Sequence, residues 1–131
     1  MIYLKTKEEI ELLRENNILV SRALAEVGRH VKPGITTREL NDIAESFIRA
    51  NGAIPAFLGY QDYPASACIS VNDQVVHGIP SDYVIKDGDI VSVDTVVKLN
   101  GFCADSAYTF PVGEVAPEVL QLMRTTKEAL Y

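Results

Sequence analysis

One hairpin signal constrains the fold of this chain more than any other feature of its sequence. Residues 90–110 read IVSVDTVVKLNGFCADSAYTF, with β-branched residues on both sides of Asn100 and Gly101. Both central residues tolerate a positive φ, so an Asn-Gly pair between such runs predicts two antiparallel strands joined by a type I′ turn. With a two-residue loop, Leu99 faces Phe102, and the register of the whole hairpin follows.

The predicted register places two carboxylates on one face of the hairpin. Asp94 faces Ala107, and Asp105 faces Val96. Facing residues share a side of the sheet, and so do residues two apart. Asp94 and Asp105 are therefore expected to be diagonal neighbours, with Cβ atoms somewhat under about 7–8 Å apart.

This pair needs neutralisation, because two carboxylates on an otherwise apolar face repel each other and resist desolvation. Two divalent cations bridged by carboxylates would supply it, and two-metal hydrolases hold such cations about 3.5–4 Å apart. The alternative is that one aspartate is a solvated strand residue and the other belongs to a turn. A bulge would also change the parity on which the register depends.

Length and composition are those of one modest globular domain, with 131 residues of which 47% are hydrophobic and 23% charged. The net charge of −6 and the lack of any Lys/Arg block argue against direct binding of nucleic acid. Two cysteines, Cys68 and Cys103, do not make a disulfide framework and favour a reduced, cytoplasmic setting. We find no apolar signal core and no stretch as long as a membrane span, so no membrane partner is expected.

Two capping boxes predict two helices before the hairpin. Residues 6–9 and 36–39 both fit the S/T-x-x-E signature. The apolar spacing behind them predicts a first helix over about residues 7–31 and a second that ends at Asn-Gly 51–52. His30 falls in the last turn of the first helix, where a surface position is expected rather than a ligand. Both helices are expected to cover one face of the sheet.

Residues 53–64 are rich in proline, glycine and aromatic residues and are predicted to form a loop. Tyr60 and Tyr63 lie within it. Aromatic loop residues of this kind either pack as a lid over the core or line a pocket, and the sequence leaves both readings open.

The next segment predicts a short strand pair. Residues 67–71 alternate as a strand, an Asn-Asp turn follows, and residues 74–77 are predicted to return beside the first strand. His77 would then stand at a strand end beside Gly78. A lone histidine is usually structural, but strand ends next to loops favour functional positions.

A third helix is predicted after the hairpin, because Ala-Pro-Glu 116–118 places proline at or near a first helical position. The pattern then runs to Tyr131 without a C-cap or a terminal glycine, which indicates a truncated fold rather than a finished one. The apolar side of this helix carries Val119, Leu120, Met123 and Leu130.

Three segments together resemble the type I methionine aminopeptidases. They are GYQDYPASACISVNDQVVHGIP, KDGDIVSVD and NGFCADSAYTF, and the resemblance extends from the first predicted helix to the last residue. The spacing of Asp94 and Asp105 is also that of the family's first two metal ligands. The resemblance implies an α+β fold, with residues 1–131 as the N-terminal half of a pita-bread (creatinase/aminopeptidase) catalytic domain.

The resemblance also implies an activity. Members of this family are cytoplasmic metalloaminopeptidases that remove the initiator methionine from nascent polypeptides, close to the ribosome, with two divalent metal ions in a complete site. Cobalt, manganese, iron and zinc all suit such mixed oxygen and nitrogen ligands. Carried onto this sequence, Asp94 and Asp105 are metal ligands, and His77 contacts the substrate near the scissile bond.

The pocket for the methionine side chain is implied in the same way. Tyr60, Tyr63 and Cys68 match the positions that line it in the family. Phe57 departs from the pattern, because the family often has a small residue or cysteine there. The wall of the pocket is therefore expected to differ at Phe57.

The resemblance leaves the metal site incomplete, because the family's other ligands, one histidine and two glutamates, come from the second half of the fold. Neither His30 nor Glu118 stands at a matching position. Two carboxylates alone cannot fix a hydrolytic metal pair and its bridging water. The chain alone is therefore expected to lack meaningful activity, and its uncovered sheet edge is expected to make it self-associate.

Two other functions remain open at this point. One is a catalytically dead half-domain that binds N-terminal peptides or a partner protein. The other is a member of the proline-peptidase branch of the same fold. Those proteins usually carry an extra N-terminal domain, whereas here the first predicted helix begins close to Met1, which disfavours this assignment.

Overall fold

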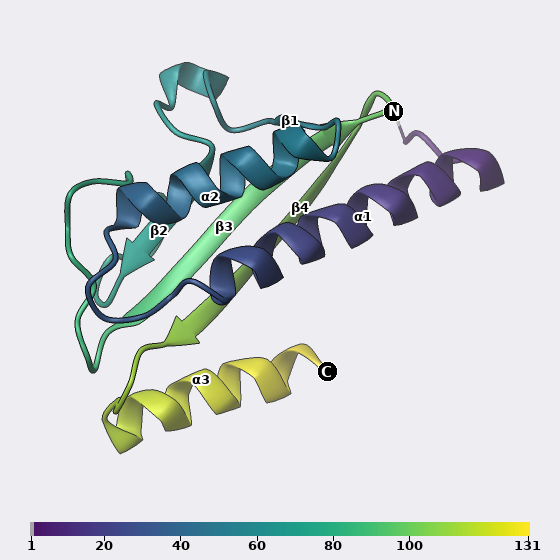
Figure 1. The fold of residues 1–131 in the computed structure, drawn as a ribbon. Helices are drawn as coiled ribbons and strands as arrows, with labels where there is room; N and C mark the ends of the chain where they lie inside the picture. Colours follow the sequence, from purple (N-terminus) through teal and green to yellow (C-terminus); the bar gives the residue numbers. More distant parts are fainter. Residues whose placement is uncertain (1) are drawn as a thin grey trace.

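The computed structural model describes residues 2–131, which form a four-stranded antiparallel sheet with helices (Figure 1). In chain order the elements are α1 (Lys7–Gly28), α2 (Thr37–Ala50), β1 (Ile54–Pro55), the 3-10 turn η1 (Tyr60–Asp62), β2 (Ala67–Val71), β3 (Ile90–Leu99), β4 (Phe102–Pro111) and α3 (Pro117–Leu130). This arrangement confirms the predicted α+β class.

The long strand β3 organises the sheet. One side of β3 pairs with β4 along the whole of both strands, and its other side pairs with β2 and β1. Leu99 faces Phe102 across the turn, where Asn100 has φ 53° and Gly101 has φ 82°. These positive φ values are those of a type I′ turn, so the predicted turn and register are confirmed.

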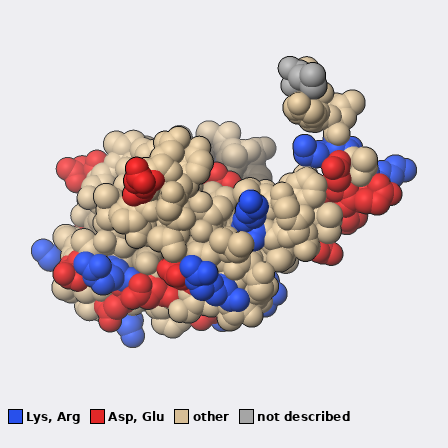
Figure 2. Space-filling view, turned by 90° about the horizontal axis from the view of Figure 1, so that it is seen from above, with Lys and Arg blue, Asp and Glu red and all other residues tan. Residues whose placement is uncertain are grey.

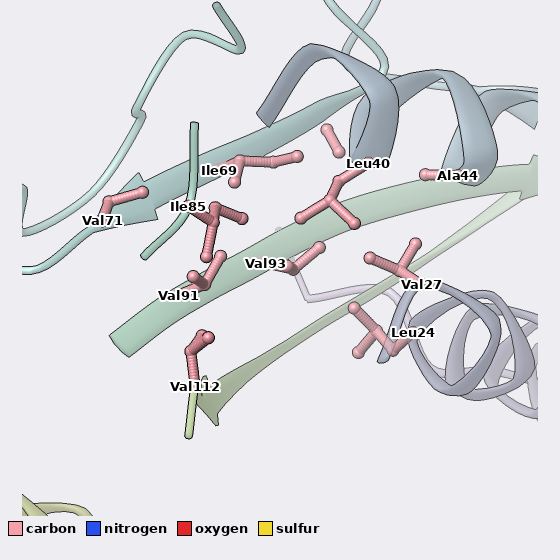
Figure 3. Close-up of a cluster of buried hydrophobic side chains, with 11 residues drawn as sticks. Leu24, Val27, Leu40, Ala44, Ile69, Val71, Ile85, Val91, Val93 and Val112 are labelled. Atoms are coloured by element: carbon pink, nitrogen blue, oxygen red, sulfur yellow. The ribbon is translucent and has the colours of Figure 1, made fainter. Parts of the chain in front are cut away.

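Helices α1 and α2 lie beside each other over one face of this sheet (Figure 1). Both begin with the predicted capping boxes, in which the Thr6 and Thr36 side chains accept from the backbone N–H of the glutamate three residues on. The hydrophobic core fills the space between the helices and the sheet (Figure 3). Its larger cluster consists of Leu24, Val27, Leu40, Ala44, Ala67, Ile69, Val71, Ile85, Val91, Val93 and Val112.

The end of α1 differs from the prediction, because the helix stops at Gly28 rather than near residue 31. The chain tightens there, with the His30 amide donating to the carbonyl of Val27 at 2.9 Å, the short-range pattern of a final 3-10 turn. His30 therefore lies beyond the helix, partly exposed, with Nδ1 2.9 Å from the carbonyl of Glu26.

The predicted returning strand at residues 74–77 is wrong. The chain turns back after β2, but Asn72 and His77 have φ values of 53° and 58°, which no regular strand accommodates. The side chain of Gln74 also accepts the N–H of Val71 at 3.0 Å, so a side chain takes the place of a ladder partner.

Helix α3 follows β4, and the predicted proline stands in its first turn. It lies apart from α1 and α2, next to the far end of β4 (Figure 1). No residue of α3 is buried, and Leu122 and Leu130 are 63% and 77% exposed. Within residues 2–131, no helix combines the length and the apolar character that a membrane crossing needs.

Candidate metal and substrate site

Asp94 and Asp105 lie on the same face of the β3–β4 hairpin, as predicted. Asp94 pairs with Ala107 and Asp105 with Val96, and the pairing is continuous, without a bulge. The neighbouring Val93 points to the other face, into the core beneath the helices. Both aspartates stand within strands, so the alternative that places one of them in a turn is wrong.

The environment of Asp94 disfavours its charged form. Burial and, after it, the nearby carboxylate of Asp105 together raise the pKa of Asp94 to about 6, while the positive charge of His77 acts in the opposite direction. Oδ1 of Asp94 is buried and has no hydrogen-bond partner among the described residues. Asp105 is exposed at the open side of the pair.

These features fit a divalent cation. An orphaned buried carboxylate oxygen, next to a second carboxylate with no basic side chain paired to either, is the donor set that a hard or borderline metal ion uses. Within residues 2–131, however, no group of three or more histidine, cysteine or acidic side chains is placed to hold a metal. The ligand roles of Asp94 and Asp105 therefore stay predictions.

Cys68 lies directly against this pair, because β2 pairs with β3 so that Cys68 faces Asp94. The cysteine is buried, and burial raises the pKa of its thiol; the hydroxyl of Tyr63 lowers that pKa, while the charges of Asp94 and Asp105 raise it again. The thiol is therefore held neutral. It offers the site a small apolar surface rather than a nucleophile.

Tyr63 continues this surface. Its hydroxyl lies 3.2 Å from the carbonyl of Ala67 and 3.1 Å from that of Gly78, and burial raises its pKa. The ring of Phe57 packs edge-on against Tyr63, with 6.0 Å between centroids. The structure thus places Phe57 against Tyr63, and Tyr63 next to Cys68, which faces Asp94. A pocket lined by Tyr63 and Cys68 stays a prediction.

Tyr60 is placed differently. It is 63% exposed in η1, so it does not pack over the core, and its hydroxyl contacts only the neighbouring Gln61, at 3.4 Å, among the described residues. A place for Tyr60 at the outer rim of the pocket stays a prediction.

His77 is close enough to Asp94 for its charge to affect the pKa of that carboxyl. It is exposed, and it stands in a left-handed backbone conformation rather than at a strand end. Sequence reasoning missed the residue that holds the next peptide, Ser70, whose Oγ accepts the N–H of Gly78 at 3.0 Å. Strand alternation could have found it, since Ser70 follows Cys68 on the same face of β2.

Residues 11–131 match the metallopeptidase family M24. Methionine aminopeptidase 1 of Bacillus subtilis is 48% identical over the whole chain, and the match covers 53% of that protein. Among solved structures, methionine aminopeptidase from Rickettsia prowazekii has 40% identity and a TM-score of 0.96, covering 98% of this chain and 52% of that one. An Xaa-Pro dipeptidase from Bacillus anthracis has 25% identity and a lower TM-score of 0.75, covering 90% of this chain and 32% of that one.

These likenesses establish the pita-bread fold, and the chain spans about half the length of the curated relatives it matches. Divalent metal cofactors are implied by the metallopeptidase family to which the match assigns it. With its paired strand aspartates and its match over residues 11–131, this chain belongs to the metallopeptidase family M24.

Proposed function

We propose that this chain supplies one half of a metalloaminopeptidase site that removes the N-terminal methionine from peptides. The observation that carries the proposal is the Asp94–Asp105 pair, in which Asp94 has a buried carboxylate oxygen without a partner among the described residues and pairs across the sheet with Cys68. The likeness to methionine aminopeptidases over the whole chain supports the same function.

Each residue has a distinct part in this proposal. The carboxylates of Asp94 and Asp105 would hold divalent metal, two ions in a complete site, chosen from cobalt, manganese, iron and zinc. Such metal polarises a carbonyl and lowers the pKa of a bound water. His77, beside the carboxylates, would contact the substrate near the scissile bond.

The pocket would receive the methionine side chain. A neutral thiol at Cys68 and the aromatic faces of Phe57 and Tyr63 suit a flexible thioether, because sulfur makes favourable contacts with aromatic rings. Phe57 would narrow the wall where relatives carry a smaller residue. Tyr60 would close the outer side when a peptide is bound.

The cellular setting of the proposal is the cytoplasm near the ribosome, where new N-termini emerge. Both cysteines are free thiols, which agrees with a reducing compartment. Acidic and basic side chains lie interspersed on the face drawn in Figure 2, so that face offers no basic patch for nucleic acid (Figure 2).

We also propose that copies of this chain associate. Within residues 2–131, β4 pairs with β3 alone, which leaves the outer edge of a ten-residue strand without partners. An unpaired edge of that length is a template for another strand. The exposed leucine side chains of α3 lie next to the same edge, and contact between two copies would bury them away from solvent.

A second candidate function is a catalytically dead module that binds N-terminal peptides or a partner protein. The observation that favours it is the shortage of ligands, since no group of three or more histidine, cysteine or acidic side chains among the described residues is placed to hold a metal ion. Metal binding separates the two candidates, because a peptide-binding module has no use for a cation.

The experiment is calorimetric titration of the chain with Mn²⁺ and Co²⁺, before and after Asp94→Asn and Asp105→Asn. We expect weak binding that either substitution abolishes. Asp73→Asn is a matched control, because this acidic residue lies in the turn after β2. Binding that persists unchanged in both site variants would reject the metal site and favour the peptide-binding module.

A further inference from the structure

The backbone of Gly78, next to His77, is held at both its N–H and its carbonyl. Its N–H donates to Oγ of Ser70 at 3.0 Å. Its carbonyl accepts the backbone N–H of Ile69 at 2.8 Å and the hydroxyl of Tyr63 at 3.1 Å. Three contacts on the backbone of one residue, two of them from side chains, hold the peptides on both sides of Gly78 and leave little freedom to His77.

Only glycine allows this arrangement. A Cβ at position 78 would collide with the carbonyl of Ile69 and would lie 2.8 Å from Cα of Ser70. Gly78 itself is buried against β2. The backbone at Gly78 therefore lies too close to β2 for any side chain to fit between them.

His77 enters this fixed peptide in an unfavourable conformation. Its φ of 58° lies in the left-handed region, which non-glycine residues adopt only when the surroundings determine it. On the N-terminal side of His77, the loop residues Asp73, Val75 and Val76 are exposed, so this loop offers few contacts that would hold His77 in place. The restraint comes from the other side, through Gly78.

We propose that Ser70 is a positioning residue, which fixes the Gly78 peptide and through it aims the imidazole of His77 at the carboxylate pair. Ser70 is suited to this task because it is 4% exposed and lies on the face of β2 that also carries Cys68. Its hydroxyl therefore holds the N–H of Gly78, next to His77, from within the sheet. Tyr63 supports the following peptide, through the carbonyl of Gly78.

This inference rests on the proposed function for its purpose, but not for its geometry. If His77 contacts substrate, a loop that let it swing would lose the alignment that catalysis needs. The contacts of Ser70 and Tyr63 with Gly78 form a clamp, and this clamp would hold the histidine in place before any ligand binds. A test that reads the backbone of His77 directly therefore separates the clamp from the question of what the site binds.

The test is NMR spectroscopy on the isotope-labelled chain. In the wild type we expect His77 carbon shifts typical of a positive φ, and a Gly78 amide that exchanges with solvent far more slowly than that of exposed Val76. Ser70→Ala should shift the His77 signals toward ordinary loop values and speed Gly78 exchange by about three- to tenfold, the loss expected for one hydrogen bond. Ser70→Thr retains the hydroxyl and should restore both signals.

Ser66→Ala is the matched control, because Ser66 is equally buried and its hydroxyl bonds to Glu45 at 2.6 Å, away from His77. It should cost stability without changing His77. A folded Ser70→Ala chain with unchanged His77 shifts and Gly78 exchange overturns the proposal. If Ser70→Ala does not fold, the wild type decides: a Gly78 amide that exchanges as fast as Val76 also overturns it, and a protected one supports it.

The proposed function is read separately in the same samples. Addition of the peptide Met-Ala-Ser, with Mn²⁺ replaced by diamagnetic Zn²⁺, should perturb the His77 ring signals if the histidine contacts substrate. A lack of perturbation would count against the substrate role and leave the clamp intact. If Ser70→Ala changes the His77 shifts and the Gly78 exchange rate but leaves peptide binding unchanged, Ser70 positions His77 as proposed, and the role of this positioning in substrate binding is rejected.

Discussion

Asn16 and Leu99 are joined by a buried hydrogen bond, although they lie far apart in the sequence. Nδ2 of Asn16, on α1, donates to the carbonyl of Leu99 at 2.9 Å and to that of Phe102 at 2.8 Å. One amide group thus bridges the last residue of β3 and the first of β4, across the Asn-Gly turn. The register that pairs Asp94 with Ala107 is therefore fixed by the first helix as well as by the turn.

Substitution of Asn16 should destabilise the fold. Asn16→Ala removes the two hydrogen bonds that the buried Asn16 side chain donates to backbone carbonyls, and we expect a loss of about 1–3 kcal/mol in the free energy of unfolding. Urea denaturation followed by circular dichroism measures it. Asn17→Ala is the control, since its amide bonds only the exposed carbonyl of Leu13 and should change stability by less than about 0.5 kcal/mol. Equal effects of the two substitutions would contradict this role for Asn16.

The raised pKa of Asp94 makes the metal-free chain less stable as pH rises. The folded state binds a proton at Asp94 up to about pH 6, whereas an unfolded chain releases it near pH 4, so unfolding becomes easier between these values. We expect a loss of about 1 kcal/mol across that window after allowance for solvent screening. Asp94→Asn should remove this part of the pH dependence, and urea titrations in chelator from pH 4 to 7 test it. If the wild type instead became more stable relative to Asp94→Asn as pH rises over that range, the prediction would be wrong.

The chain alone should show no meaningful aminopeptidase activity. Within residues 2–131 the site holds two carboxylates and one nearby histidine, too few ligands to fix a metal pair and its water. The measurement is release of free methionine from Met-Ala-Ser with Co²⁺ or Mn²⁺ present. Turnover at a rate typical of enzymes by the purified 131-residue chain, abolished by Asp105→Asn, would refute this expectation.

Self-association should depend on the outer edge of β4. In a hairpin with a two-residue turn, Ala107 directs its N–H away from β3, so Ala107→Pro removes an outward donor without breaking the β3–β4 ladder. We expect light scattering at micromolar concentration to report a dimer or larger species for the wild type and monomer for Ala107→Pro. Ala107→Val keeps the donor and should still associate. A monomeric, cooperatively unfolding wild type would mean that the chain closes its own core.

The sequence predicted the hairpin and its paired aspartates because turn chemistry and strand alternation are local. Asn100 and Gly101 determine the turn by themselves, and the register follows by counting. The capping boxes at Thr6 and Thr36 are local in the same sense. The turn and the register place Asp94 and Asp105, whereas Cys68 is indicated only by the resemblance to the methionine aminopeptidases.

The loop that carries His77 could not be predicted in this way. Its path requires glycine at position 78, because any Cβ there would collide with the backbone of β2. It also requires hydrogen bonds to the hydroxyls of Ser70 and Tyr63, which belong to other parts of the chain. Periodicity favoured a strand at residues 74–77, and tertiary contacts overrode it. The role of Asn16 is hidden for the same reason, because a polar residue in a helix does not reveal a distant partner.

The two cysteines differ in exposure, so their rates of reaction with a thiol reagent report on two different surfaces of the chain. Cys103 is exposed on β4 and shares a face with Asp105, whereas Cys68 is buried opposite Asp94. A chromogenic thiol reagent would therefore modify Cys103 quickly and Cys68 only when the sheet opens. Any molecule that covers the β4 edge would slow the first reaction, and any ligand that tightens the pocket would slow the second, so one kinetic trace would distinguish occupation of the two surfaces.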